Sequence, residues 1–327
     1  MPKVTAEAAE AVAYLRRARR VLITSHASPD GDSLGSALAM QQLARALAID
    51  GHVVQRDPHP ASLGFLPGLE AVEITAGISP GLADTFDLAV VLECPGRFRP
   101  GLEGLEHLPI LNIDHHLENE RYGELNYLDE EAPAVGEMVL RMAEAAGVGV
   151  TPAMATCLYT ALVTDTGDFR YSNATPRAFE AARRLVAAGA APHLIAEALW
   201  NQTPARVVRL TAEVLATLEL YAGGRLAVVT CDLGMLARAG ARPEDTENLI
   251  NTPRTIAGVE VAVLLKAFAP GVTRASLRSR GEVDVQKVAA RFGGGGHRNA
   301  AGCTLSSPLE EARRALLDHL VPLLELR

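Results

Sequence analysis

The chain has 327 residues, enough for two domains of about 100–200 residues each. Hydrophobic residues make up 48% and charged residues 21%, which is typical of soluble globular proteins and excludes a disordered chain. The net charge of −8 argues against a broad surface for duplex DNA, because such surfaces carry an excess of Lys and Arg. No run of about 18 apolar residues is present, so we expect no membrane-spanning helix.

The N-terminus and the cysteines both favour a cytoplasmic protein. Residues 1–15 contain acidic side chains and lack the apolar segment of a signal peptide. The four cysteines are scattered and form no C-x-x-C pair, which indicates reduced thiols rather than disulfides or a zinc site. Aromatic residues make up 4%, which disfavours a platform for long single strands.

The first half of the chain alternates predicted strands with helical patterns. The predicted strands are short and almost entirely apolar, which is typical of strands buried on both faces of a parallel α/β sheet. We expect strands at residues 19–26, 51–55, 87–93 and 108–116, and a helix at 33–48.

The second half begins with helices and ends in a smaller domain. Gly223–Gly224 indicates the tight turn of a hairpin within residues 218–230. We expect helices at 135–147, 155–165, 175–189, 192–200, 201–217, 284–292 and 307–326, strands at 258–268 and 272–279, and a loop at 293–297. The predicted fold is α/β, with an N-terminal parallel-sheet domain (1–190), a helical connector (191–217) and a smaller α/β domain (218–327).

Polar side chains follow three of the predicted strands of the first domain. Asp30 and Asp32 come after the first strand, Glu93 ends a second, and residues 114–116 (Asp-His-His) end a third. Ligands of open α/β sheets bind beyond the carboxyl ends of the strands. The three clusters therefore predict one site.

Each cluster also has a plainer interpretation when taken alone. His26, Asp30 and Asp32 have a spacing that suits Mn(II), Fe(II) or Zn(II), but an Asp/Ser turn that caps a helix is the alternative. The Asp-His-His triplet fits a metal site or a solvated loop, and Asp165 fits a ligand or a plain helix end. The presence of all these signals in one chain favours the metal site.

Four segments together resemble the N-terminal motifs of the DHH phosphoesterase superfamily: His26-x-x-x-Asp30-x-Asp32, the acid Glu93, Asp114-His115-His116 and Asp165-Thr166-Gly167. GGGGHRNAAG at residues 293–302 resembles the signature of the DHH-associated C-terminal domain. The chain length and residues 164–179 are most similar to the NrnA-type branch of nanoRNases and pAp phosphatases. RecJ-type nucleases are usually larger, and family II pyrophosphatases share the first domain's motifs but lack the GGGGH domain.

The resemblance implies two divalent ions, most often Mn(II). Glu93 would bridge them, although the family generally has Asp at this place, and the extra methylene would require a shifted backbone or a different coordination. His116 would contact the scissile phosphate or assist the leaving group, with a supporting role as the alternative. The implied ligands and catalytic groups are His26 and Asp30 for one ion, and Asp32, His115 and Asp165 for the other.

The second domain supplies candidate substrate-binding residues. Gly294, Gly295 and Gly296 offer backbone N–H groups to a phosphate, and His297 adds a donor. The resemblance implies that Arg278 clamps a terminal phosphate, for which a guanidinium offers two parallel donors. Asn251 and Arg254 are weaker candidates. A flexible glycine turn and a surface arginine are the plainer interpretations.

The implied function is hydrolysis of very short single-stranded RNA to 5′-mononucleotides, together with removal of the 3′-phosphate of pAp, in a cleft between the domains. Cyclic dinucleotides or pApA are the runner-up substrates. A second alternative is a nucleotide-binding module in which Glu93 has weakened catalysis. The apolar C-terminal helix could pack on its own domain or on a second subunit, so a homodimer stays open.

Overall fold

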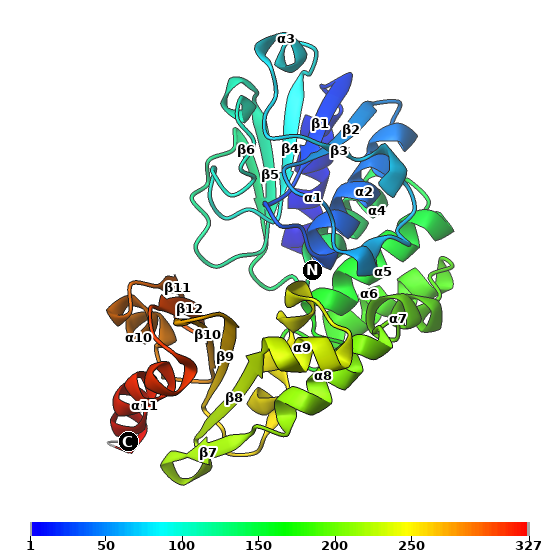
Figure 1. The fold of residues 1–327 in the computed structure, drawn as a ribbon. Coiled ribbons are helices and arrows are strands. Elements are labelled where there is room, and N and C mark those ends of the chain that lie inside the picture. The colour runs from blue at the N-terminus through cyan, green and yellow to red at the C-terminus, as the bar shows by residue number, and fades with distance from the viewer. Residues whose placement is uncertain (1, 326–327) are drawn as a thin grey trace. The chain divides into compact units, whose positions relative to one another are not determined.

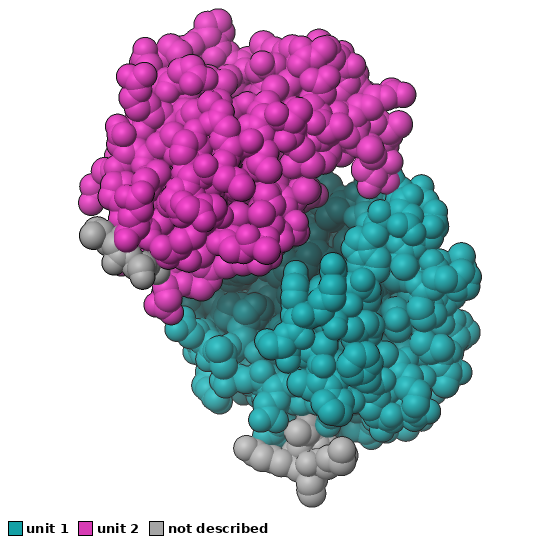
Figure 2. Space-filling view, turned by 90° about the horizontal axis from the view of Figure 1, so that it is seen from below, with its two compact units in different colours: residues 1–202 teal, residues 203–327 magenta. Residues whose placement is uncertain are grey.

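The structure is a computed structural model that describes residues 2–325. It divides into two compact units, residues 1–202 and residues 203–327, which are teal and magenta in Figure 2. Each unit contains its own six-stranded sheet (Figure 1). The predicted α/β class, with a separate sheet in the C-terminal part, is confirmed.

The segment expected to connect the domains contributes to both units. Helix α7 (Pro192–Trp200) lies in the first unit, and helix α8 (Ala205–Leu215) lies in the second. Ile195 belongs to the core of unit 1, whereas Leu210 and Val214 belong to a core of unit 2. The boundary between the units therefore lies between these two helices.

The sheet of unit 1 is parallel throughout, in the order β3-β2-β1-β4-β5-β6. The chain starts at the central strand β1, moves outward to β3, and returns to β4 on the other side of β1. Ligands of open α/β sheets bind at such a point of reversal, outside the carboxyl ends of the strands. The strands are β1 (Arg20–Thr24), β2 (Asp50–Gln55), β3 (Glu73–Ile74), β4 (Leu88–Leu92), β5 (Ile110–Asp114) and β6 (Leu125–Leu128).

Helix α2 forms the centre of unit 1 and is buried on nearly every side. It contacts the sheet as well as α4 and α5, which explains why most of its residues are apolar or small. The helices are α1 (Pro2–Leu15), α2 (Gly31–Ala46), α3 (Pro80–Ala83), α4 (Val135–Ala146), α5 (Pro152–Asp165), α6 (Pro176–Ala187) and α7. No helix among the described residues has both the length and the apolar character needed to cross a membrane.

The other face of this sheet is covered by loops and short turns. Leu22 and Val91 on that face form an apolar cluster with Ile78, Leu102 and Leu105. Ile78 comes from the connection between β3 and β4, and the two leucines come from the connection between β4 and β5. The β4–β5 connection therefore packs on the sheet through some residues and exposes others.

The sheet of unit 2 has the order β11-β12-β10-β9-β8-β7, and β8 pairs with β9 in parallel while the other pairs are antiparallel. Helices α10 and α11 contribute to the core on one face, and α8 and α9 contribute to the core on the other. The remaining elements are β7 (Glu219–Tyr221), β8 (Leu226–Asp232), α9 (Leu233–Ala239), β9 (Val261–Ala269), β10 (Val272–Ser279), α10 (Val285–Arg291), β11 (Gly295–His297), β12 (Ala300–Leu305) and α11 (Leu309–Glu325).

Two expectations for unit 2 need correction. The β7–β8 hairpin is present, but its connection is a 3-10 turn at Ala222–Gly224 rather than a two-residue turn. The predicted loop at 293–297 is wrong in part, because Gly295–His297 form the edge strand β11, paired with β12. A run of glycines carries no strand signal, and the pairing partner decides its structure. The sequence patterns also do not predict α1, β3, β6, α9 or β12.

Replacing Gly35 by Ala is expected to destabilise unit 1. The added Cβ would lie 2.5 Å from the carbonyl oxygen of Cys157, a backbone atom of α5. Overpacking of this kind costs about 1–3 kcal/mol, which urea unfolding measures. Gly149→Ala is the matched control, because a Cβ there meets nothing within 4 Å and should change the free energy of unfolding by less than about 0.5 kcal/mol. Equal stability of the two variants would contradict the tight contact between α2 and α5.

Candidate active site

The seven predicted metal and catalytic residues of unit 1 gather at the carboxyl ends of β1, β4 and β5. Their ligand atoms form three overlapping groups, and within each group all atoms lie within 4.8 Å of one another. Glu93 belongs to all three groups. The groups are Glu93, His115 and His116; Asp32, Glu93, His115 and Asp165; and His26, Asp30 and Glu93.

Asp30 has a structural role in addition to its place in the cluster. Its Oδ1 accepts a hydrogen bond from the backbone N–H of Ser33 at 3.0 Å, so that Asp30 caps helix α2. The same Oδ1 lies 3.8 Å from Nε2 of His26. Burial lowers the pKa of His26, but the interactions with Asp30 and Glu93 outweigh burial and raise it to about 10. Both interpretations of this motif, the helix cap and the cluster, therefore hold.

Asp32 is almost fully buried and is held by the start of helix α4. Its carboxylate accepts hydrogen bonds from the backbone N–H groups of Val135 (2.7 Å) and Gly136 (2.9 Å) and from the hydroxyl of Ser36 (2.9 Å). Burial, followed by the charge of Asp165, raises the pKa of Asp32 to about 7. The helix N-terminus offsets part of the charge, since its free N–H groups carry partial positive charge.

Glu93 follows β4 in a left-handed backbone conformation, with φ of 56°. This conformation costs roughly 1–2 kcal/mol for a residue with a Cβ. The residue is 4% exposed, and its Oε2 lies 3.3 Å from Nε2 of His26. Burial and the charge of Asp32 raise the pKa of Glu93 well above its usual range. Although Glu stands here where the resemblance leads us to expect Asp, a carboxylate still lies in the centre of the cluster.

His115 and Asp165 form the opposite side of the cluster. Nδ1 of His115 is 2.9 Å from the carbonyl oxygen of Ala132, and its Nε2 is 3.8 Å from Oδ2 of Asp165. Asp165 ends helix α5, and the amide of Asn173 contacts its Oδ2 at 3.3 Å. The loop after α5 thus holds the carboxylate in place.

His116 is oriented by the first residue of its own motif. Its Nδ1 donates to Oδ1 of Asp114 at 2.8 Å, and Asp114 is fully buried. The amide of Asn119 donates to the other oxygen of Asp114 at 2.7 Å. The sequence predicts a site at the Asp-His-His triplet but does not show that its members differ in role. In the structure the aspartate positions the second histidine.

Three polar side chains that the sequence did not single out fix the Cys94–Pro95 peptide, one residue beyond Glu93. The carbonyl oxygen of Cys94 accepts hydrogen bonds from Asn112 (3.2 Å), Asn119 (3.3 Å) and the hydroxyl of Tyr122 (3.0 Å). Asn112 is fully buried in β5. In addition to its bond to Cys94, its Oδ1 accepts a hydrogen bond from the side-chain amide of Asn119 at 2.8 Å. Of these three, Asn112 could have been found from the sequence, because it is a polar residue within an otherwise apolar strand.

The residues present fit divalent cations. Oε2 of Glu93 is buried and accepts no hydrogen bond from the described residues, although Nε2 of His26 lies 3.3 Å from it. Such an oxygen is costly to bury unless a cation or a donor reaches it. Nδ1 of His26 and of His115 each contact a backbone carbonyl, which leaves Nε2 directed at carboxylates, as is usual for metal-binding histidines. The mixture of imidazole and carboxylate donors suits Mn(II), Fe(II) or Zn(II).

The structure brings two predicted arginines of unit 2 close together. Arg278 lies on β10, half-buried, and burial followed by the charge of Arg254 lowers its pKa. Neither arginine forms an ion pair with a carboxylate of the described residues. Asn251 is exposed at the end of a 3-10 turn next to Arg254. Two unpaired guanidinium groups at one place are suited to an anion.

The glycines at residues 293–296 have a role in the packing of unit 2 in addition to their predicted role in binding a phosphate. The N–H of Gly293 donates to Ala290 and the N–H of Gly294 donates to Ala289, so these two groups end helix α10 and are not free for a phosphate. A Cβ on Gly294 would lie 2.1 Å from the carbonyl oxygen of Gly302. This corrects the expectation for Gly294. Gly296 likewise has a Cβ position 2.5 Å from a backbone oxygen, whereas Gly295 faces open space and His297 is exposed.

Comparison with known proteins identifies the family. Residues 20–162 match the N-terminal domain of the DHH family, and residues 223–324 match the DHHA1 domain. The chain is 34% identical over 304 residues to the bifunctional oligoribonuclease and PAP phosphatase NrnA of Thermus thermophilus, which covers 91% of this chain and 88% of that protein. The chain belongs to the DHH family.

Two further proteins match nearly the whole chain. The NrnA protein of Bacillus subtilis, with the same description, is 26% identical over 91% of this chain and 93% of its own. The crystal structure of an exopolyphosphatase-related protein from Bacteroides fragilis superposes with a TM-score of 0.84 at 25% identity, covering 98% of both chains. The DHH match contains every predicted ligand except Asp165, which lies just beyond it. That the two units of this DHH protein act on one substrate stays a prediction.

Replacing Asn119 by Ala is expected to weaken Mn(II) binding about 10- to 100-fold, the usual effect of removing a group that orients metal ligands. Asn119 contacts both Asp114 and the carbonyl oxygen of Cys94, the residue after Glu93, so its loss loosens two parts of the cluster. Calorimetric titration of metal-free protein with Mn(II) measures the affinity. Asn201→Ala is the control, because its amide contacts only Glu197 at the surface. Wild-type affinity in the Asn119 variant would contradict the positioning role.

Proposed function

We propose that this protein is a metal-dependent phosphoesterase that hydrolyses very short RNA to 5′-mononucleotides and removes the 3′-phosphate of pAp. The observation that carries the proposal is Glu93, whose carboxylate belongs to all three ligand groups and whose buried Oε2 accepts no hydrogen bond from the described residues while it faces Nε2 of His26 at 3.3 Å. The substrate class follows from the relatives named oligoribonuclease and PAP phosphatase, which match 91% of the chain.

The proposed cofactor is a pair of divalent ions, with Mn(II) favoured by the imidazole and carboxylate donors. Two bound ions would supply a nucleophile at neutral pH and offset the charge that develops on the phosphate oxygens. Glu93 would be shared between the ions, because it is common to the group on each side. The ligands on the two sides are His26 and Asp30, and Asp32, His115 and Asp165.

Both proposed reactions break the same kind of bond. Release of a 5′-mononucleotide leaves the phosphate on the 5′-oxygen and therefore cleaves the bond between phosphorus and a 3′-oxygen. Removal of the 3′-phosphate of pAp cleaves that bond as well. One arrangement of catalytic groups can thus serve both substrates, with the 3′-oxygen as the leaving group in each.

His116 is the side chain that we assign to the leaving oxygen. Its Nδ1 is held by Asp114, and a ring nitrogen lies within 4.8 Å of ligand atoms of Glu93 and His115. With Nδ1 engaged, Nε2 remains to hold a proton and to give it to the 3′-oxygen as the bond breaks. Asp114 keeps the ring oriented.

Unit 2 is proposed to bind the phosphate at the end of the substrate. Arg278 and Arg254 carry two positive charges with no acidic partner among the described residues, which suits a terminal phosphate of a nucleotide. Gly295, Gly296, His297 and Asn251 complete the proposed anion site, with Gly295 the glycine that has open space around it. Recognition of an end rather than of a long backbone favours short single strands and agrees with the acidic net charge.

The decisive test is hydrolysis by metal-stripped protein to which Mn(II), Mg(II) or no metal is returned. We expect Mn(II)-dependent loss of an RNA dinucleotide, faster than loss of a long single-stranded RNA, and release of phosphate from pAp. Asp165→Asn should abolish both reactions while the fold is retained, because it removes one ligand charge without changing the shape of the side chain. Absence of turnover with every metal, despite stoichiometric metal binding, would sink the proposal and favour cyclic dinucleotides or a binding role.

Arg278→Ala is expected to raise KM for both pAp and the dinucleotide with little change in kcat. A hydrogen bond to a charged group is worth about 1.5–3 kcal/mol, so KM should rise roughly 10- to 150-fold. Arg280→Ala is the matched control, since Arg280 is an exposed arginine just after the same strand. Equal KM values for the two variants would remove Arg278 from the substrate site.

A further inference from the structure

Phe98 is the most exposed large apolar side chain among the described residues, at 89%. It lies in the connection between β4 and β5, between Arg97 and Arg99. A single exposed apolar residue is common, but an exposed aromatic ring between two arginines is a feature of proteins that bind single-stranded nucleic acid. Neither the metal cluster nor the core uses this ring.

The segment that carries Phe98 touches the first motif of the metal cluster. The backbone N–H of Ala27 donates to the carbonyl oxygen of Arg99 at 2.9 Å, and the carbonyl oxygen of Ala27 contacts Nδ1 of His26 at 2.8 Å. The segment begins directly after Glu93. Phe98 is therefore only a few residues from ligands on two strands, within the same unit.

The two arginines beside Phe98 keep their charge available. The guanidinium of Arg97 donates to the carbonyl oxygen of Glu106 at 3.2 Å, which orients it without neutralising it. No ion pair is formed by Arg97 or Arg99 with the carboxylates that the structure describes. Both cations can therefore attract the phosphates on either side of a base.

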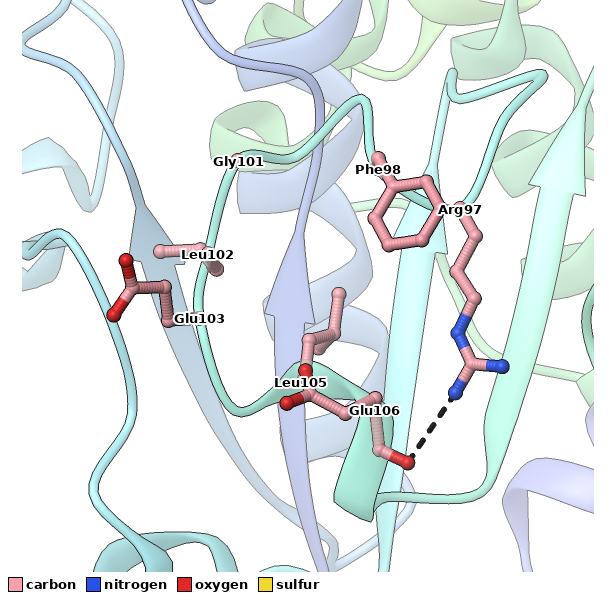
Figure 3. Close-up of a pocket in the computed structure, with 7 residues that line it drawn as sticks. All are labelled: Arg97, Phe98, Gly101, Leu102, Glu103, Leu105 and Glu106. Atoms are coloured by element: carbon pink, nitrogen blue, oxygen red, sulfur yellow. Dashed lines mark hydrogen bonds between the residues drawn. The ribbon is translucent and has the colours of Figure 1, made fainter.

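A cavity of about 590 Å³ opens beside the ring, within the range of small-molecule sites. Figure 3 shows its lining, with Phe98 and Arg97 on one side and Glu103 on the other. Leu102 and Leu105 contribute apolar surface. Glu103 and Glu106 disfavour a phosphate inside the cavity, but their oxygens can accept hydrogen bonds from the amino groups of a base. The cavity thus suits a base, while the arginines suit the phosphates.

We propose that Phe98 stacks a nucleobase of the RNA substrate and that the cavity lined by residues 97–106 receives this base. The proposal rests on the proposed function for the identity of the ligand and adds a base-recognition site to it. Stacking on an aromatic ring tolerates any base, which suits an enzyme that degrades short RNA irrespective of sequence. The charged neighbours hold the strand, and the ring holds the base.

The test compares Phe98→Ala with the wild type on the dinucleotide ApA and on analogues that lack either base. Loss of one stacking contact, worth about 1–3 kcal/mol, predicts a rise in KM for ApA of about 5- to 150-fold with kcat little changed. Phe98→Trp should restore the wild-type KM. The analogue without the stacked base should be hydrolysed equally by wild type and Phe98→Ala. Leu194→Ala, which removes another exposed apolar side chain of unit 1, is the control.

Three results would overturn the proposal: an unchanged KM for ApA in Phe98→Ala, an equal loss on every analogue, or a change in oligomeric mass that accounts for the effect. If the wild type hydrolyses no ApA, the proposed function fails on that result alone. Calorimetric titration of ApA into metal-free wild type and Phe98→Ala then decides the stacking proposal separately. Equal affinities of those two proteins would exclude it.

Discussion

Repulsion between buried carboxylates is the constraint on which the rest of unit 1 depends. Asp32, Glu93 and Asp165 are brought within a few ångströms of one another, and burying charge without compensation is costly. Hydrogen-bond donors compensate part of this charge. The first turn of α4 donates to Asp32, and the amide of Asn173 donates to Asp165. Among the described residues, the buried Oε2 of Glu93 accepts no hydrogen bond of this kind and faces only Nε2 of His26, at 3.3 Å, so its charge lies where a cation would be bound.

The same centre explains an otherwise unfavourable polar cluster in the sheet. Asn112 and Asn119 are not needed to complete the core, and an apolar residue would suit the middle of β5 better. Their hydrogen bonds fix the carbonyl oxygen of Cys94, the residue that follows Glu93 and its left-handed backbone. Asn119 also reaches Asp114, so one amide connects the position of Glu93 with that of His116. These polar side chains therefore lower the stability of unit 1, but they fix the positions of Cys94 and Asp114 beside the cluster.

The sequence was most informative where one rule of geometry decides the outcome. Short apolar strands indicate a parallel sheet, and such a sheet brings its carboxyl ends together, so Asp30, Glu93 and His115 could be placed in one site in advance. The roles of Asn112 and Tyr122 could not, because they depend on contacts between residues whose spacing has no characteristic pattern. Gly294 was misread for a related reason: a glycine required by a neighbouring backbone and one required by a ligand look alike in a sequence.

The two faces of the parallel sheet differ in how much change they tolerate. One face is filled by tightly packed helices, whereas the other is covered by the β3–β4 and β4–β5 connections, and loops accept substitution more readily than packed helices do. The second of these loops begins beside Glu93, a candidate metal ligand, and yet contributes its own surface to solvent. The surface of this loop can therefore diverge during evolution, while the cluster at the strand ends is inherited unchanged.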